Sequence, residues 1–326
     1  MSGSARARPR AVFFGSPDFA VPSLERLLAD AVVVGVVTQP DRPSGRGQAV
    51  AEPAVKRIAR ARAPGVPILQ PEKIRTGDFE ARLRELGADV FVVVAYGRIL
   101  PQTILDLPPL GPWNVHASLL PRLRGAAPIQ WAIINDDART GVSIMRMEAG
   151  LDTGPVAAQV ADDIHSDDTA ATLAARLARL GADLLGATLP AIAGGTVVVE
   201  PQNDAQATLA PILRKEDGRL DFTQASRAVS ARARGVDPWP GATALLAGEP
   251  LKLFSPRVPD GVPDGSDVRA IGGAPGTVVA IDAAGLWVAC ADRAIVFAEV
   301  QLAGRKRMTA SAAAAGRALT TGVQLG

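Results

Sequence analysis

Asn114, His116 and Asp152 are three side chains whose types and spacing could together perform acid–base chemistry. Asn114 and His116 stand two residues apart, and residues 113–115 are predicted to be the end of a short strand. Alternate residues of a strand point to the same side, so the amide and the imidazole should project together. Asp152 follows in a Gly-Leu-Asp-Thr-Gly turn. An amide can donate to developing negative charge, an imidazole can move a proton, and a carboxylate can set the imidazole's charge and tautomer.

The alternative for this Asn-x-His pair is a structural histidine that is satisfied by hydrogen bonds. The second histidine, His165, lies in the acidic run 162–168, which is more typical of a solvated loop or a helix start. No His/Cys cluster has the spacing of a metal site, so no metal is expected. The single cysteine, Cys290, cannot form an internal disulfide and is expected to lie in a buried strand.

The first half of the chain alternates strand and helix signals, which predicts an α/β domain with a mostly parallel, Rossmann-like sheet. Residues 10–15, 31–37 and 88–95 are apolar runs, and the last is the best candidate for a central strand. Ser16 is expected to cap the first helix. Residues 96–100 leave the carboxyl end of the central strand, where ligands bind in such sheets. Because the first strand is followed by a single glycine and no G-x-G-x-x-G pattern, a nicotinamide cofactor is disfavoured.

The second half has a different pattern. Residues 196–213 are polar and contain prolines, so they are predicted to link a first domain, residues 1–195, to a second, residues 214–326. In the second domain a helix at about residues 223–234 precedes five short alternating segments, which predict a small OB-like β-barrel. Residues 261–274 are interpreted as a loop insertion.

Composition favours a soluble protein of the cytoplasm: hydrophobic residues make up 48% of the chain, and no apolar run is long enough to span a bilayer. The start of the chain shows no secretory signal. The formal net charge is only +2, but residues 38–63 hold six basic and two acidic side chains. Within them, residues 38–47 contain two prolines and two glycines and are predicted to be an exposed loop carrying Arg42 and Arg46. A solvated face is the alternative explanation for such a charge excess.

The run from Asn114 to Gln130, followed by residues 150–155, resembles the signature of the folate-dependent formyltransferases. The resemblance extends almost from end to end, with further similar motifs at residues 14–24, 38–47, 94–101, 215–219, 237–241 and 304–308. The departures are mild: Ser16 stands where threonine is common, Leu123 where an aromatic residue is common, and the 261–274 insertion is unusual.

The resemblance implies a Rossmann-like formyltransferase domain that binds 10-formyltetrahydrofolate, and an OB-like domain that helps to hold an initiator methionyl-tRNA. Asn114, His116 and Asp152 would be catalytic. The folate site would be lined by two segments: Ser118, Leu119, Leu120 and Pro121, and Tyr96, Gly97, Arg98, Ile99 and Leu100. The tRNA contacts would be Arg42, Arg46, Arg305, Lys306 and Arg307, with Arg46 preferred in the first loop. A monomer is expected.

The implied chemistry suits these residues. A neutral amine attacks the formyl carbon and produces a tetrahedral oxyanion, and each well-aimed donor stabilises such a species by ~2.7–4 kcal/mol. The proton of the attacking amine could pass to His116, to Asp152 or to a water between them. The alternatives are a phosphoribosyl amine or a nucleotide-sugar amine as acceptor, a hydrolase of formyltetrahydrofolate, and a non-enzymatic OB-type RNA-binding protein. The last is disfavoured because only 4% of the residues are aromatic.

Overall fold

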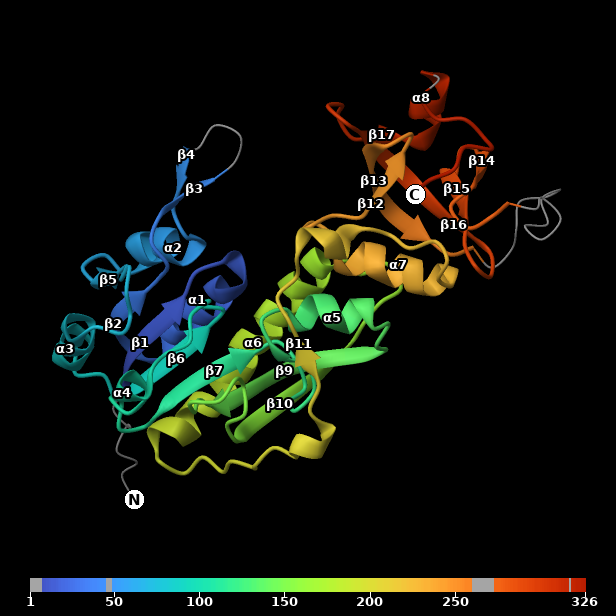
Figure 1. The fold of residues 1–326 in the computed structure, drawn as a ribbon. Coiled ribbons are helices and arrows are strands. Elements are labelled where there is room, and N and C mark those ends of the chain that lie inside the picture. The colour runs from blue at the N-terminus through green and yellow to red at the C-terminus, as the bar shows by residue number, and fades with distance from the viewer. Residues whose placement is uncertain (1–7, 45–48, 260–272, 317) are drawn as a thin grey trace. The chain divides into compact units, whose positions relative to one another are not determined.

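The computed structural model describes residues 8–44, 49–259, 273–316 and 318–326 (Figure 1). The chain divides into two compact units, and each is discontinuous in sequence. The first comprises Met1–Pro128, Thr140–Asp162 and Ala174–Ala210. The second comprises Ile129–Arg139, Asp163–Leu173 and Pro211–Gly326. Among the described residues, no helix is both long enough and apolar enough to cross a membrane.

A seven-stranded sheet forms the centre of the first unit, in the order β10-β9-β7-β6-β1-β2-β5 (Figure 1). Its strands are β1 (Arg10–Gly15), β2 (Val32–Val37), β5 (Ile68–Leu69), β6 (Val90–Val94), β7 (Pro112–His116), β9 (Arg139–Arg146) and β10 (Val156–Asp163). β1 pairs in parallel with β2 and β6, β2 with β5, and β6 with β7, whereas β9 runs antiparallel to β7. The predicted Rossmann-like, mostly parallel sheet is confirmed.

The apolar run predicted to be the central strand is β6, and all five of its residues are buried. It lies between β1 and β7. Phe14 at the end of β1 packs against Phe91 and Tyr96, with ring centroids 5.2 and 5.6 Å apart. Because β6 and β7 are parallel, their carboxyl ends meet at the same edge of the sheet. The segment after β6 and His116 at the end of β7 are therefore brought to that edge.

Helices connect these strands: α1 (Val21–Asp30), α2 (Ala54–Arg62), α3 (Gly77–Glu85), α4 (Gln102–Leu105), α5 (Pro128–Ile134) and α6 (Ala170–Ala193).

The expectation that Ser16 caps the first helix was wrong. A 3-10 turn, Asp18–Ala20, precedes α1, so the α-helix begins five residues after Ser16 and has Pro22 in its first turn. Ser16 instead accepts a hydrogen bond from the backbone N–H of Gln39, at 3.0 Å, and joins the ends of β1 and β2.

The segment predicted to be an exposed loop, residues 38–47, contains the first strand of a short hairpin, in which β3 (Arg42–Ser44) pairs antiparallel with β4 (Ala49–Ala51). Arg46 lies outside the described residues. Asp41, at the base of the hairpin, accepts hydrogen bonds from the buried Lys56 ammonium and from the amide of Gln70, and these two contacts lower the pKa of Asp41. The base of the hairpin is thus fixed to the body of the first unit.

The second unit contains a curled antiparallel sheet in the order β12-β13-β16-β15-β14, with β17 added to β16. The strands are β12 (Thr243–Leu246), β13 (Glu249–Arg257), β14 (Val278–Ile281), β15 (Leu286–Ala289), β16 (Ala294–Leu302) and β17 (Met308–Thr309), and the helices are α7 (Ser226–Gly235) and α8 (Ala310–Ala315). This arrangement confirms the OB-like prediction. Most of the predicted insertion, residues 261–272, lies outside the described part of the chain.

Two short segments that lie earlier in the sequence, Ile129–Arg139 and Asp163–Leu173, complete the second unit by packing with α7. The buried Arg234 guanidinium donates to the carbonyl of Asp168, at 3.0 Å, and lies 3.8 Å from a carboxylate oxygen of Asp136. A methyl group added at Gly235 would come within 2.5 Å of Ile134. The sequence-based division at residues 195 and 214 does not include these segments in its second domain, and it stays a prediction.

Candidate active site

The side chains of Asn114, His116 and Asp152 converge at the end of β7. The two β7 residues point to the same side of the strand, as the alternation predicts. Asn114 Nδ2 donates to Asp152 Oδ1 at 3.3 Å, and His116 Nδ1 lies 3.6 Å from Asp152 Oδ2. The His116 side chain is 5% exposed and that of Asp152 is 14% exposed. An amide, an imidazole and a carboxylate therefore share one largely enclosed position.

The His116 ring is oriented by a backbone carbonyl. Its Nε2 atom lies 3.0 Å from the carbonyl oxygen of Leu123. A carbonyl oxygen can only accept, so Nε2 carries the hydrogen of this bond. Nδ1, which faces Asp152, is the nitrogen left for proton exchange.

Both carboxylate oxygens of Asp152 are held from outside the turn that carries it. Oδ1 accepts from Asn114, and Oδ2 accepts from the backbone N–H of Gly125 at 2.9 Å. Asp152 itself has a φ of +52°, which aspartate and asparagine tolerate better than most residues. A Cβ at Gly154 would lie 1.9 Å from the carbonyl oxygen of Arg146, so the turn requires glycine at that position.

Gly154→Ala is expected to lower the free energy of unfolding by about 1–3 kcal/mol, since the added methyl group has no room and the backbone must shift. Urea unfolding of the purified variant measures this loss. Gly77→Ala is the matched control, because a Cβ at Gly77 meets no atom within 4 Å. Equal urea midpoints for the two variants would contradict the packing argument.

The predicted folate segment after β7 is shaped by buried polar contacts. The buried Ser143 hydroxyl donates to the carbonyl of Ser118 at 2.6 Å and accepts from the backbone N–H of Leu120 at 3.1 Å. Gln159 Nε2 donates to the carbonyl of Leu120 at 2.9 Å. The Ser118 and Leu120 side chains are buried, whereas Leu119 and Pro121 are half-buried. Leu119 and Pro121 are therefore the members of this segment with side-chain surface left for a ligand.

The second predicted folate segment, residues 96–100, also contains both buried and exposed residues. Tyr96 and Leu100 belong to the hydrophobic core, and burial raises the pKa of the Tyr96 hydroxyl to about 12. Arg98 donates to the carbonyl of Glu72 and to the side chain of Gln39, at 2.7 and 3.0 Å. Gly97 and Ile99 are exposed, and Ile99 retains 66% of its accessible surface.

The predicted tRNA contacts lie in separate places in the sequence. Arg42 is exposed at the start of β3, and Arg305 and Lys306 are exposed in the turn between β16 and β17. Arg307 is engaged within its own unit: its Nε donates to Glu299 at 2.9 Å, and its guanidinium lies 4.2 Å from the ring centroid of Phe254.

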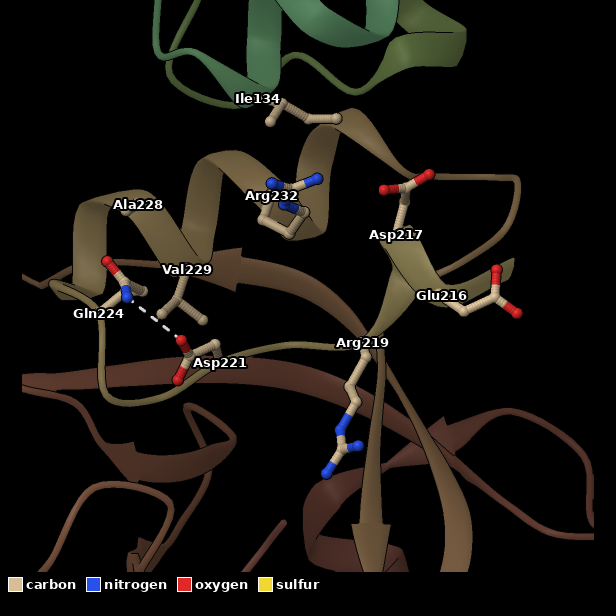
Figure 2. A pocket seen from close by; sticks show the side chains of 9 residues that line it. All are labelled: Ile134, Glu216, Asp217, Arg219, Asp221, Gln224, Ala228, Val229 and Arg232. Atoms are coloured by element: carbon tan, nitrogen blue, oxygen red, sulfur yellow. Dashed lines mark hydrogen bonds between the residues drawn. The ribbon is translucent and has the colours of Figure 1, made fainter. Parts of the chain in front are cut away.

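A pocket in the second unit lies outside the predicted sites (Figure 2). It is lined by Ile134, Glu216, Asp217, Arg219, Asp221, Gln224, Ala228, Val229 and Arg232. Three carboxylates and two guanidiniums share this lining, and Gln224 Nε2 donates to Asp221 at 3.1 Å. Because acidic groups outnumber basic ones, the pocket does not suit a phosphate. In the described part of the chain, no group of three or more His, Cys, Asp or Glu side chains is arranged to hold a metal.

Sequence reasoning missed the contribution of the segment expected to be a linker. In it, β11 (Leu209–Ala210) pairs in parallel with β8 (Arg124–Gly125). Gln202 hydrogen-bonds the backbone carbonyls of Asp152 and Gly154, at 2.8 and 2.7 Å. Nothing in the local sequence marks Gln202, which lies in a polar stretch beside a proline. Only the folded chain shows that it reaches the turn that carries the candidate carboxylate.

Both halves of the chain match models of formyl transferase domains. Residues 10–189 match the family model described as formyl transferase, and residues 212–318 match the formyl transferase C-terminal domain. A relative named methionyl-tRNA formyltransferase, from Anaeromyxobacter sp. (strain K), is 51% identical over 92% of this chain and 95% of the relative. The relative of that name from Myxococcus xanthus (strain DK1622) is 47% identical over 98% of each chain.

A solved structure shares the fold. HypX from Aquifex aeolicus, in complex with tetrahydrofolic acid, matches with a TM-score of 0.61 at 16% identity. The match covers 94% of this chain but 47% of HypX, so this chain spans about half the length of that protein. At this identity the likeness is one of fold.

Proposed function

This chain belongs to the formyl transferase family, and we propose that it transfers the formyl group of 10-formyltetrahydrofolate to the amino group of initiator methionyl-tRNA. This reaction supports translation initiation in the cytoplasm. The observation that carries the proposal is the convergence of Asn114, His116 and Asp152 in a chain that aligns with relatives of that activity over more than nine-tenths of its length. A single chain contributes all three side chains, which fits action as a monomer.

In the proposed reaction the amino nitrogen of the methionyl group attacks the formyl carbon, and the carbonyl electrons move onto its oxygen. Asn114 Nδ2 donates one of its hydrogens to Asp152, and its second hydrogen is available to that oxyanion. The attacking nitrogen loses a proton to His116 Nδ1, to Asp152 or to a water between them. The tetrahedral species then collapses, the bond to N10 of the folate breaks, and N10 receives a proton.

The folate proposal rests on family membership and on the geometry of two segments at the same edge of the sheet. The family binds tetrahydrofolate derivatives, and the HypX complex contains tetrahydrofolic acid. In our proposal the accessible members of these segments, Gly97, Ile99, Leu119 and Pro121, contact the folate. Their buried or hydrogen-bonded neighbours, Tyr96, Arg98, Leu100, Ser118 and Leu120, hold the backbone in place.

The tRNA proposal assigns Arg42 and Arg46 to one contact region, and Arg305, Lys306 and Arg307 to another. Arg46→Ala is expected to lower kcat/KM for the tRNA about tenfold or more with little change in tetrahydrofolate affinity. A guanidinium can bind phosphate or a base edge through two parallel hydrogen bonds, and alanine cannot. Steady-state kinetics at saturating folate measure the loss.

Arg75→Ala is the control for Arg46→Ala, because Arg75 is another exposed arginine of the first unit. Equal kinetics for the two variants would remove Arg46 from the proposed contacts. Arg46→Lys separates charge from geometry: lysine restores a simple charge effect, but it does not restore bidentate recognition.

One experiment tests the function as a whole. The protein is incubated with 10-formyltetrahydrofolate and, in separate reactions, with initiator methionyl-tRNA, a nucleotide-sugar amine, a phosphoribosyl amine or buffer alone. Formyl-methionyl-tRNA is the expected product. Preferential formylation of another amine would identify a different acceptor. Release of formate in buffer would identify a hydrolase, and tRNA binding without turnover would favour a non-enzymatic RNA-binding protein.

A further inference from the structure

We propose that Gln202 is a positioning residue for formyl transfer: its side-chain amide holds the Asp152 turn against the Arg124–Gly125 strand. The inference rests on the proposed function only in that formyl transfer is the reaction measured. Gln202 lies 50 residues from Asp152 and 78 from Arg124 in the sequence. None of the four hydrogen bonds of its amide involves Asn114, His116 or the carboxylate of Asp152, so its influence on the reaction passes through the backbone that carries that carboxylate.

The Gln202 amide uses its full hydrogen-bonding capacity. Its Nε2 donates to the carbonyl of Asp152 at 2.8 Å and to the carbonyl of Gly154 at 2.7 Å. Its Oε1 accepts from Nε and Nη2 of Arg124, at 3.0 and 2.8 Å. An amide offers two donor hydrogens and two acceptor lone pairs, and here all four are used. Arg124 is 6% exposed and also pairs with Asp204 at 2.7 Å.

The orientation of this amide is fixed by its neighbours. Two carbonyl oxygens lie on one side, and they can only accept. A guanidinium lies on the other side, and it can only donate. Rotating the amide by 180° would place oxygen against two oxygens and N–H groups against N–H groups. Gln202 is therefore a directional connector between the two segments, which a side chain with acceptors alone cannot replace.

These contacts bear on both sides of the Asp152 carboxylate. The turn adopts a φ of +52° at Asp152, and Gln202 binds the carbonyl of that same residue. On the other side, the backbone N–H of Gly125 donates to Asp152 Oδ2. Gly125 is held by β11, because it pairs with Ala210, whose carbonyl oxygen would lie 2.7 Å from a Cβ at Gly125. Residues 202–210 thus set the position of the carboxylate relative to Asn114 and His116.

The test uses two substitutions in the full chain. Gln202→Met keeps the length of the side chain and removes all four hydrogen bonds, and Gln202→Glu keeps the acceptor for Arg124 and removes both donors. Gln206→Met and Gln206→Glu are the matched controls, because Gln206 is an exposed residue of the same segment. A displacement of reacting groups by about 1 Å can cost about 100-fold in rate. Single-turnover formyl transfer is therefore expected to fall between about 10-fold and 100-fold in both Gln202 variants. Binding of tetrahydrofolate and the KM for the acceptor should remain near wild type.

A double-mutant cycle with Asp152→Asn separates positioning from general damage. If Gln202 acts through the carboxylate, Gln202→Met should reduce the rate much less in the Asp152→Asn background than in the wild type. If Gln202→Met reduced the rate by the same factor in both backgrounds, the proposal would be overturned. Rates equal to those of the Gln206 controls would also overturn it, as would loss of the folded state in both Gln202 variants, which would make the residue purely structural. A wild-type protein that formylates no acceptor would instead contradict the proposed function.

Discussion

Asp152→Asn is expected to reduce single-turnover formyl transfer by about 10²–10⁴-fold, the range that a lost acid–base or charge-supporting group typically costs. The carboxylate accepts hydrogen bonds on both oxygens, from Asn114 and from the backbone of Gly125, and it faces His116. Asparagine offers one acceptor oxygen, so in either orientation its NH₂ group faces one of these donors. The negative charge that faces His116 Nδ1 is lost as well.

The fold should survive this change, because asparagine tolerates the positive φ found at residue 152. The rate is measured across pH with saturating folate and tRNA, and thermal unfolding is followed in parallel. Glu148→Gln is the control, because it removes one negative charge from an exposed side chain four residues away. If Asp152→Asn stayed within a few-fold of that control at every pH, Asp152 would not belong to the catalytic set.

Asn114→Asp should have a comparable effect on the rate for a different reason. It keeps the shape of the side chain but replaces the donor with an acceptor, and the loss of one oxyanion donor alone costs about 10²–10³-fold. It also brings a second carboxylate to the position that now lies 3.3 Å from Asp152 Oδ1. Two carboxyl groups so close cannot both ionise freely, so one should hold its proton to a higher pH than usual.

That coupling gives Asn114→Asp a signature in stability. A carboxyl group whose pKa is raised by folding contributes full stability below its unfolded pKa, near 3.9, and the contribution is lost as the pH rises through the folded value. The unfolding temperature of Asn114→Asp, relative to the wild type, should therefore decrease from acidic to neutral pH. Asn203→Asp, at an exposed residue that caps a 3-10 turn, should show no such trend. A flat difference for Asn114→Asp would mean that the two carboxylates do not interact.

The sequence predicts those features of the fold that depend on local periodicity. The five apolar residues of β6 predict a strand buried on both faces. The alternation of Asn114 and His116 predicts that both side chains point to one side of β7, and the structure directs both toward Asp152. The position of Asp152 relative to this strand depends on contacts distant in sequence, so it was inferred from the family motif.

The features that were missed depend on competition between distant partners. Ser16 has the right type for a helix cap, but the N–H group of Gln39 uses its hydroxyl. Arg307 belongs to a basic turn, yet Glu299 and Phe254 engage its guanidinium. Gln202 stands in a stretch without periodicity, and its partners lie 50 or more residues away. In each case the residue type limits which contacts the side chain can make. The contacts that form depend on which distant residues the fold brings close.

The two internal segments of the second unit limit how the protein can be recombined with its relatives. Arg227 and Arg234 of α7 pair with Asp136, and Arg234 also binds the backbone of Asp168. A chimaera joined near residue 211 would combine α7 of one parent with α5 and residues 163–173 of the other. Its arginine–aspartate pairs, and the close contact between Gly235 and Ile134, would form only if the two parents carried compatible residues at these positions. Residues 129–139, 163–173 and 211–235 should therefore be exchanged together between relatives, although three separate stretches of the gene encode them.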